Sequence, residues 1–265
     1  MAIITDKQEL ENLKYSCRIL MSAFHHASDW IKPGVSCGEI NRKVESFMRK
    51  HGGIPSFLNY GSGGLGPYKY AICLSINDEV VHGIAPDNKI IPENGLIKLD
   101  MGVNFKGSFS DSARTYIVGD VPENAKKLVE VCNESLLRGI AVLKDGAKVG
   151  DIGHAIDSYV KQFGFGNVEG LGGHGCGRKV HEPPFIPHMG KRGSGPRLSE
   201  NQVICIEPML TIGSSDVITD NTAADGWTIR TIDGSWAAHS EHEILITKKG
   251  YEILTDIKIE DILPL

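Results

Sequence analysis

A glycine-rich segment carries two histidines at a spacing that suits a shared cleft. His174 and His181 are seven residues apart in the segment GGHGCGRKVHEPP, which runs from Gly172 to Pro184. That spacing does not fit the i, i+4 histidine pair of a helical metal motif, and the closing prolines exclude a helix. We expect a strand, a flexible turn and a second extended piece, with both imidazoles facing one cleft. On these residues alone, a surface loop with two solvated histidines is the alternative.

Four acidic residues stand in or beside apolar, strand-like runs, where an unpartnered carboxylate is costly. They are Asp100 in GLIKLDMGV, Asp111 in GSFSDSARTYIVG, Glu207 in QVICIEPML and Glu241 in HSEHEILIT. A hairpin turn over residues 104–107 would place Asp100 directly opposite Asp111. Facing carboxylates repel each other unless a cation lies between them, so this pair predicts a metal site.

His174 adds one imidazole to the four carboxylates. Four carboxylates balance the charge of two divalent cations, and a largely oxygen-based ligand set with one imidazole suits Mn²⁺, Fe²⁺, Co²⁺ or Zn²⁺. Two such ions, about 3.5–4 Å apart, would lower the pKa of a shared water and promote hydrolysis. His242 and Glu243 directly follow Glu241 and either support the ligands or lie on a solvated strand edge.

Two helical pairs are predicted to position these residues. Apolar residues at steps of three and four predict a helix from Lys7 to Ile31, and a capping box at Ser36 and Glu39 begins a second one. The segment Gly34–Phe47 resembles Gly146–Tyr159 at a constant offset of 112 residues. That offset is too long for a solenoid repeat, so it predicts two duplicated halves.

Strand-like runs follow each helical pair. They are Tyr70–Ile76, Leu96–Val103, Ser108–Val118, Asn167–Leu171, Gln202–Ile212, Trp227–Thr231 and Glu241–Thr247. Short connectors between several of them predict an antiparallel sheet with helices packed on one face. No Pro/Ser-rich linker divides the chain, so we expect one domain over 1–265 with halves at about 1–120 and 121–265.

The composition restricts the class of protein. The chain has 265 residues and a net charge of −5 with mixed signs, which does not indicate a nucleic-acid-binding surface. Six scattered cysteines without a CxxC motif suit reduced thiols in a cytosol. There is no apolar run of about 18 residues, the rough minimum for a membrane span. We expect a cytoplasmic protein.

Taken together, the motifs resemble those of the type I methionine aminopeptidases of peptidase family M24. The resemblance rests on GGHGCGRKVHEPP, LDMG with SDSART, CIEPML, and GWTIRT followed by SEHEILIT, and it spans about Gly34 to Thr247. It implies the α+β pita-bread fold, in which pseudo-twofold duplicated halves form a curved antiparallel sheet covered by helices. The internal repeat agrees with that fold.

The resemblance also implies a dinuclear centre of divalent ions (Co, Mn, Fe, Zn or Ni). Its ligands would be Asp100, Asp111, His174, Glu207 and Glu241. Asp111 and Glu241 would bridge the two ions, Asp100 would bind one, and His174 and Glu207 would bind the other.

The implied reaction is removal of the N-terminal methionine from nascent proteins and peptides with a small second residue, by water that the two metals activate. Glu207 would shuttle the proton. His181 would bind the substrate carbonyl oxygen, and His82 in ICLSINDEVVHGI would bind near the leaving nitrogen and assist it. The partner would be a peptide or nascent-chain N-terminus with transient ribosome contact, and the resemblance implies a monomeric catalytic domain that binds neither nucleic acid nor membrane.

Three features depart from the family pattern near the methionine pocket. They are the glycine-rich insertion at Gly61–Gly66, Val180 before His181, and Ser240 before Glu241. Val180 and Ser240 stand where bulky aromatic residues are common, so both changes are expected to loosen the pocket. Pocket residues are expected at Tyr60, Cys73 and Trp227, with Tyr68 and Tyr70 competing for one position.

Two other functions compete with this interpretation. An Xaa-Pro aminopeptidase or prolidase shares the GHG and HExP motifs, but it usually has Glu-Pro-Gly where this chain has Glu207-Pro208-Met209, and an additional N-terminal domain. A non-catalytic peptide-binding module of the same fold would typically lose metal ligands, whereas all five are present here.

Overall fold

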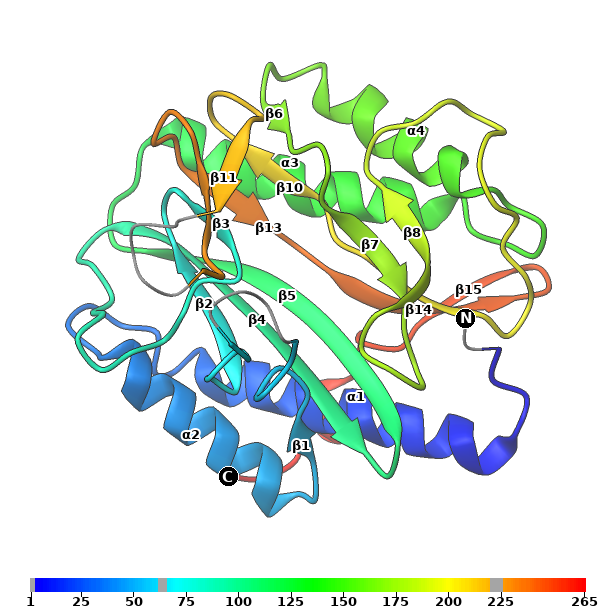
Figure 1. Ribbon diagram of the computed structural model, residues 1–265, viewed down its shortest axis with the longest axis horizontal. Helices are drawn as coiled ribbons and strands as arrows, with labels where there is room; N and C mark the ends of the chain where they lie inside the picture. Colours follow the sequence, from blue (N-terminus) through cyan, green and yellow to red (C-terminus); the bar gives the residue numbers. More distant parts are fainter. Residues whose placement is uncertain (1–2, 62–65, 220–225) are drawn as a thin grey trace.

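A computed structural model describes residues 3–61, 66–219 and 226–265 (Figure 1). Most of the predicted insertion at Gly61–Gly66 therefore lies outside the described residues. The helices are α1 (Lys7–Ala27), α2 (Cys37–Lys50), α3 (Glu123–Ala141), α4 (Val149–Val160) and a short 3-10 helix (Ile259–Asp261). In the described part of the chain, none of them is long and apolar enough to cross a bilayer.

The strands alternate with these helical pairs as the sequence predicts. They are β1 (Ile54–Pro55), β2 (Ile72–Ile76), β3 (Glu79–Val81), β4 (Gly95–Phe105), β5 (Ser108–Val118), β6 (Gly166–Asn167), β7 (Gly172–Gly175), β8 (Glu182–Pro187), β9 (Val203–Ile206), β10 (Met209–Thr211), β11 (Val217–Thr219), β12 (Ile229–Thr231), β13 (Ala237–His239), β14 (His242–Thr247) and β15 (Gly250–Ile253). The predicted strand Gln202–Ile212 is divided into β9 and β10 because Pro208, between them, has no N–H to donate to a strand ladder. The predicted strand Asn167–Leu171 is mostly irregular, since only Asn167 lies in β6.

Side-chain caps begin the two helices of the first half. The Asp6 carboxylate accepts a hydrogen bond from Glu9 N at 2.8 Å, and Ser36 Oγ accepts one from Glu39 N at 3.4 Å. The first helix ends at Ala27, four residues before the predicted end at Ile31. The Ser28 hydroxyl donates to a carbonyl of the last turn at 2.6 Å, a local bond that competes with helix continuation.

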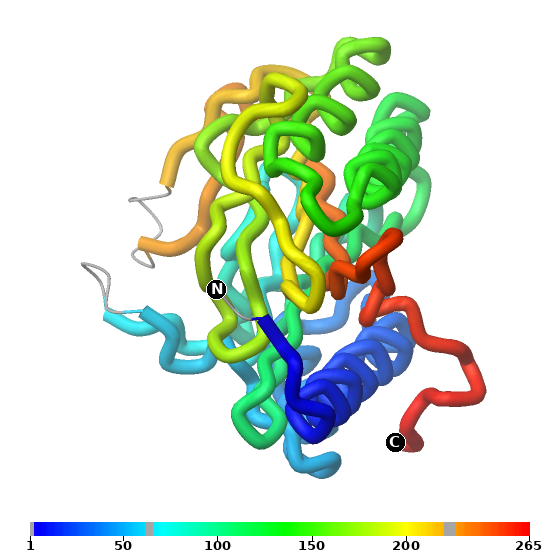
Figure 2. Tube along the Cα trace, turned by 90° about the vertical axis from the view of Figure 1, so that its right-hand side faces the viewer, coloured from blue at the N-terminus to red at the C-terminus, as the bar shows by residue number. Residues whose placement is uncertain are grey.

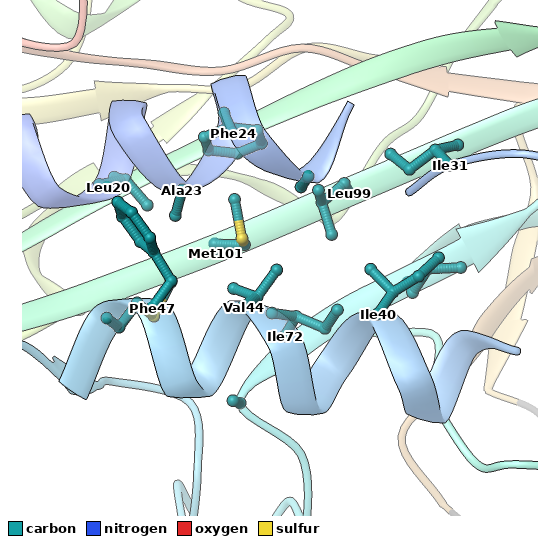
Figure 3. Close-up of a cluster of buried hydrophobic side chains, with 14 of the residues drawn as sticks. Leu20, Ala23, Phe24, Ile31, Ile40, Val44, Phe47, Ile72, Leu99 and Met101 are labelled. Carbon is teal, nitrogen blue, oxygen red and sulfur yellow. The ribbon is translucent and has the colours of Figure 1, made fainter. Parts of the chain in front are cut away.

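The apolar faces of α1 and α2 pack on β2 and β4. Figure 3 shows Phe24 from α1, Val44 and Phe47 from α2, and Leu99 and Met101 from β4 meeting in this core. In the second half of the chain, another buried cluster packs α3 and α4 against strands that include β9 and β14. In Figure 1 the two helical pairs lie on opposite sides of the molecule, with the strands between them.

The strand pairs in the described residues are antiparallel, and they form four hydrogen-bonded groups. The first contains β1, β2, β4 and β5, and the largest has the order β15-β14-β9-β7-β8. After β15 the C-terminal tail runs beside α1, so the end of the chain packs against the first half (Figure 2). Leu263 N donates to Ser22 Oγ at 2.9 Å there.

The β4–β5 hairpin corrects one prediction. Asp100 lies opposite Ala113, and Asp111 lies opposite Gly102, so the two aspartates are diagonal neighbours rather than a direct pair. The turn consists of Lys106 and Gly107 alone, both with positive φ, instead of the four residues predicted. Such a two-residue turn fits the twist of the flanking strands and displaces the pairing by two residues. Because side chains alternate with period two, both aspartates still face the same side.

Candidate metal centre

Hydrogen bonds between the halves bring two of the predicted ligands together. Glu241 N donates to Ala113 O at 2.9 Å, and Ser112 Oγ donates to Glu241 O at 2.8 Å. These bonds hold the start of β14 against β5. As a result, Asp100, Asp111 and Glu241 present carboxylate oxygens that all lie within 4.8 Å of one another.

The glycine-rich segment adds His174 to this group. Its strand–turn–strand form is as predicted: β7 and β8 are paired, and the His174 and His181 rings meet with centroids 4.4 Å apart. His174 Nε2 lies 3.4 Å from Glu207 Oε1 and 3.8 Å from Asp111 Oδ2. The structure thus brings all five predicted ligands together, while their role as ligands remains a prediction.

Close approach of β7 to its neighbours requires glycine. A Cβ at Gly173 would lie 2.2 Å from Cys205 O, and one at Gly175 would lie 2.3 Å from Pro183 O. Both atoms belong to the backbone and cannot move aside alone. The glycines on either side of His174 therefore allow its strand to fit between β8 and β9.

The carboxylates of this cluster cannot all be ionised without a compensating cation. Burial raises the pKa of Asp100 to about 7 and that of Glu207 to about 8. The pKa values of Asp111 and Glu241 are raised well above their usual range, by burial and then by neighbouring carboxylates. Crowded, desolvated carboxylates of this kind favour protonation or cation binding.

Unsatisfied atoms support cation binding. Among the described residues, Asp100 Oδ1, Asp111 Oδ1 and Glu241 Oε1 are buried and accept no hydrogen bond. Buried polar atoms are normally paired, so three acceptors in one cluster fit a cation that supplies the missing interaction.

The surroundings of the His174 imidazole also favour metal binding. Its Nδ1 lies 3.0 Å from Gly175 O, which directs the Nδ1 proton to that carbonyl and leaves the Nε2 lone pair facing the carboxylates. Burial, followed by the neighbouring His181, lowers the pKa of His174 to about 3. A neutral ring with a free Nε2 lone pair is the form that binds a metal.

Sequence reasoning missed two buried histidines beside Glu207. His188 Nε2 accepts a hydrogen bond from Glu207 N at 3.4 Å, and His239 lies on the side-chain side. His239 Nε2 lies 3.3 Å from Glu207 Oε2, and the side chain is almost completely buried. Pairing of β13 with β10 brings it there, with His239 opposite Met209. Its only signal in the sequence is an imidazole in the apolar run WAAHS, two residues before Glu241.

Glu243, which the sequence left as either a support or a strand-edge residue, is completely buried behind the cluster. Its Oε2 accepts from the Cys17 thiol at 3.3 Å and from Asp111 N at 3.4 Å. This bond to the backbone ties β14 to β5 at the position of a predicted ligand. His242 points elsewhere, with Nδ1 2.8 Å from the Thr255 hydroxyl.

The cluster lines a cavity of about 560 Å³, which His82 and His181 also line. His82 directly follows β3 and has a positive φ of 58°. Burial lowers its pKa to about 4, with smaller contributions from His181 and His239, so the ring is neutral. The β2–β3 hairpin that carries it is held by Glu79, which pairs with Lys89 at 2.6 Å and with Arg230 at 2.8 Å.

The rest of the cavity wall is largely apolar and aromatic. The expected pocket residues Tyr60, Cys73 and Trp227 all line it. Of the two competing tyrosines, Tyr68 lines the cavity, and its ring meets that of Trp227 edge-to-face at 5.6 Å. Val180 lies in one buried cluster with Phe57, Tyr68 and Cys73, which line the cavity. The Ser240 hydroxyl instead donates to Asn133 Oδ1 at 2.5 Å, away from the cavity lining.

Comparison with known proteins identifies the family. Residues 11–248 match the sequence pattern of metallopeptidase family M24. The chain belongs to metallopeptidase family M24. It is 40% identical to methionine aminopeptidase 1 of Bacillus subtilis, covering 97% of this chain and 100% of that protein. It is 41% identical to the methionine aminopeptidase of Aquifex aeolicus, with the same coverage.

Solved structures agree with this assignment and confirm the pita-bread fold. The methionine aminopeptidase of Thermotoga maritima matches with a TM-score of 0.91 and 38% identity, over 97% of this chain and 100% of that one. A prolidase from Pyrococcus furiosus matches less closely, with a TM-score of 0.76 and 25% identity, and only 66% of its chain is covered. As an M24 metallopeptidase, this protein uses a divalent metal, and the carboxylate cluster is where the structure offers ligands for it.

Proposed function

We propose that this M24 metallopeptidase removes the N-terminal methionine from peptides and nascent proteins whose second residue is small. The observation that carries the proposal is an acidic cluster with unsatisfied oxygens that lines the same cavity as several aromatic side chains. The cluster suits metal-assisted hydrolysis, and the wall suits a flexible apolar side chain such as methionine. Similarity to methionine aminopeptidases over nearly the full chain supports the same assignment.

The proposed centre holds two divalent ions, chosen from Mn²⁺, Fe²⁺, Co²⁺, Zn²⁺ and Ni²⁺. The residues that would hold them are Asp100, Asp111, His174, Glu207 and Glu241. When bound, such ions lower the pKa of water and polarise a carbonyl group. They would also offset the repulsion among the four carboxylates, whose charge they balance.

Three side chains would move or hold protons during the reaction. Glu207, whose pKa burial raises to about 8, would accept a proton from the attacking water and return it to the leaving nitrogen. His181 would donate a hydrogen bond to the substrate carbonyl oxygen as negative charge develops there. His82, which lines the cavity as a neutral imidazole, would assist at the leaving nitrogen.

We further propose that the chain acts as a monomeric, single catalytic domain in the cytoplasm. The substrate would be a free peptide or a nascent chain, with transient contact to the ribosome. The net charge of −5 gives no reason to expect a nucleic-acid-binding surface.

The test is a peptide assay that separates the rival functions. Purified protein is treated with chelator, reloaded with Mn²⁺ or Co²⁺, and offered Met-Gly-Met-Met and an Ala-Pro peptide. We expect methionine release from the first peptide only, and only with metal. Cleavage restricted to the Ala-Pro peptide would instead assign a prolidase-type activity. Metal binding without cleavage of either would favour a peptide-binding module.

A further inference from the structure

Tyr60, which lines the cavity, makes a polar contact with His181 that has no role in the reaction proposed above. Its hydroxyl lies 2.6 Å from His181 Nδ1, and the two rings meet edge-to-face with centroids 5.0 Å apart. Tyr60 lies between β1 and β2 of the first half, and His181 lies between β7 and β8 of the second. The contact therefore joins the two halves beside the candidate metal centre.

The backbone holds Tyr60 in this position. Tyr60 N donates to Phe57 O at 2.9 Å, and Tyr60 O accepts from Tyr68 N at 2.9 Å. Asn59 N donates to Tyr68 O at 2.7 Å, which closes the turn on its other side. A hydroxyl on so constrained a segment can fix the orientation of the ring it contacts.

We infer that Tyr60 is a positioning residue, whose hydroxyl donates to His181 Nδ1 and so keeps the proton of that imidazole on Nε2. A neutral imidazole has one N–H donor and one acceptor nitrogen, and the hydrogen bond at one nitrogen selects the tautomer. The inference rests on the proposed function of His181, which needs a donor directed at the substrate carbonyl oxygen. Tyr60 supplies that donor indirectly by occupying the other nitrogen.

The surroundings favour this direction of donation. A His181 ring nitrogen lies within 4.8 Å of a carboxylate oxygen of Asp111. An imidazole lone pair directed at this acidic cluster would be repelled by it, whereas an N–H directed at it would be attracted. Burial and then Asp111 raise the pKa of Tyr60, so the phenol keeps the proton that it donates.

A double-mutant cycle tests whether Tyr60 acts through His181. In metal-loaded protein, Tyr60→Phe is expected to lower kcat about tenfold and to change KM less than about twofold, since it removes one hydrogen bond outside the substrate. His181→Ala is expected to lower kcat roughly 10²–10³-fold. The double variant should match His181→Ala alone, because the hydroxyl then has no ring to orient.

Tyr68→Phe is the matched comparison. Tyr68 also lines the cavity, but its hydroxyl faces two backbone carbonyls that share its one proton, Ile72 O at 2.9 Å and Gly83 O at 2.8 Å. Its effect should multiply with that of His181→Ala, as expected for independent sites. An effect of Tyr60→Phe that multiplies in the same way would overturn the inference.

Nitrogen NMR tests the tautomer directly and does not depend on activity. In zinc-loaded protein with ¹⁵N-labelled histidine, the signal that disappears in His181→Ala should show an unprotonated Nδ1 and a protonated Nε2. In Tyr60→Phe it should show a mixture of tautomers. A protonated Nδ1 in the parent, or an unchanged signal in Tyr60→Phe, would overturn the inference. Failure of the parent to release methionine would reject the proposed function while leaving this measurement intact.

Discussion

Replacing Asp111 by asparagine should separate the metal-binding role of this residue from its contribution to the fold. Asp111 is 2% exposed, and its Oδ1 accepts no hydrogen bond among the described residues. Its backbone N–H donates to Glu243 Oε2 whatever the side chain. The substitution keeps shape and volume, so the variant should fold. It removes one of four crowded carboxylates, so without metal it should be at least as stable as the parent.

With metal bound, the parent should be the more stable of the two proteins. A ligand that binds only the folded state stabilises it by about 2.7 kcal/mol when its concentration is one hundred times Kd. For a protein of this size, that corresponds to a rise in Tm of roughly 5–10 °C. The parent should show this rise with Mn²⁺. Asp111→Asn should show little of it, because the variant lacks a charged ligand that is predicted to bridge both ions.

The assay is thermal unfolding of both proteins in EDTA and in Mn²⁺, with methionine release measured on the same samples. Asp120→Asn is the control, since Asp120 is exposed and lies two residues beyond the end of the same strand, β5. It removes the same charge and should keep both the Tm rise and the activity. An equal rise in Asp111→Asn, or full activity, would refute the assignment of Asp111 as a ligand.

Three further predictions concern pH, the substrate carbonyl and the strand that carries His174. In EDTA, stability should fall as pH rises from about 6.5 to about 8, because Asp100 and Glu207 hold protons in the folded state, with pKa values of about 7 and 8, that the unfolded chain has already released. Metal should flatten this dependence in thermal unfolding, and a stability that rises across the interval would contradict the burial argument. Below about pH 6.5 the buried histidines act in the opposite direction, since burial lowers the pKa of His82 to about 4 and that of His174 to about 3. His181→Ala should lower turnover roughly 10²–10³-fold, as loss of an oxyanion donor does, with metal content by mass spectrometry unchanged; loss of metal would mean that His181 is a ligand. Gly175→Ala should destabilise the fold by about 1–3 kcal/mol, since its Cβ would lie 2.3 Å from Pro183 O, and an unchanged Tm would show that β7 and β8 can separate freely.

The grouping of the candidate ligands could be predicted because each one interrupts a local pattern. A carboxylate in an apolar strand, or two histidines among glycines and prolines, requires a special environment wherever the fold places it. The pairing of Asp100 with Asp111 was wrong in register, yet their proximity was right. The two-residue turn at Lys106–Gly107 displaces the ladder by an even number of positions and so preserves the face.

Contacts between distant segments could not be predicted in this way. His239 reaches Glu207 only because β13 pairs with β10, and Tyr60 reaches His181 only because the two halves face each other across the cavity. Neither contact leaves a periodicity or a spacing in the sequence. The early end of α1 at Ala27 likewise depends on a local hydroxyl bond rather than on the apolar pattern, which continues to Ile31.

Anomalous diffraction from crystals loaded with Mn²⁺ would show directly whether the carboxylate cluster holds two metal ions. Two anomalous peaks should appear, about 3.5–4 Å apart, enclosed by the five candidate ligands. Asp111 and Glu241 should contact both peaks, Asp100 one of them, and His174 and Glu207 the other. Loaded crystals with no peak at this cluster, or with metal bound elsewhere in the chain, would contradict the proposed centre.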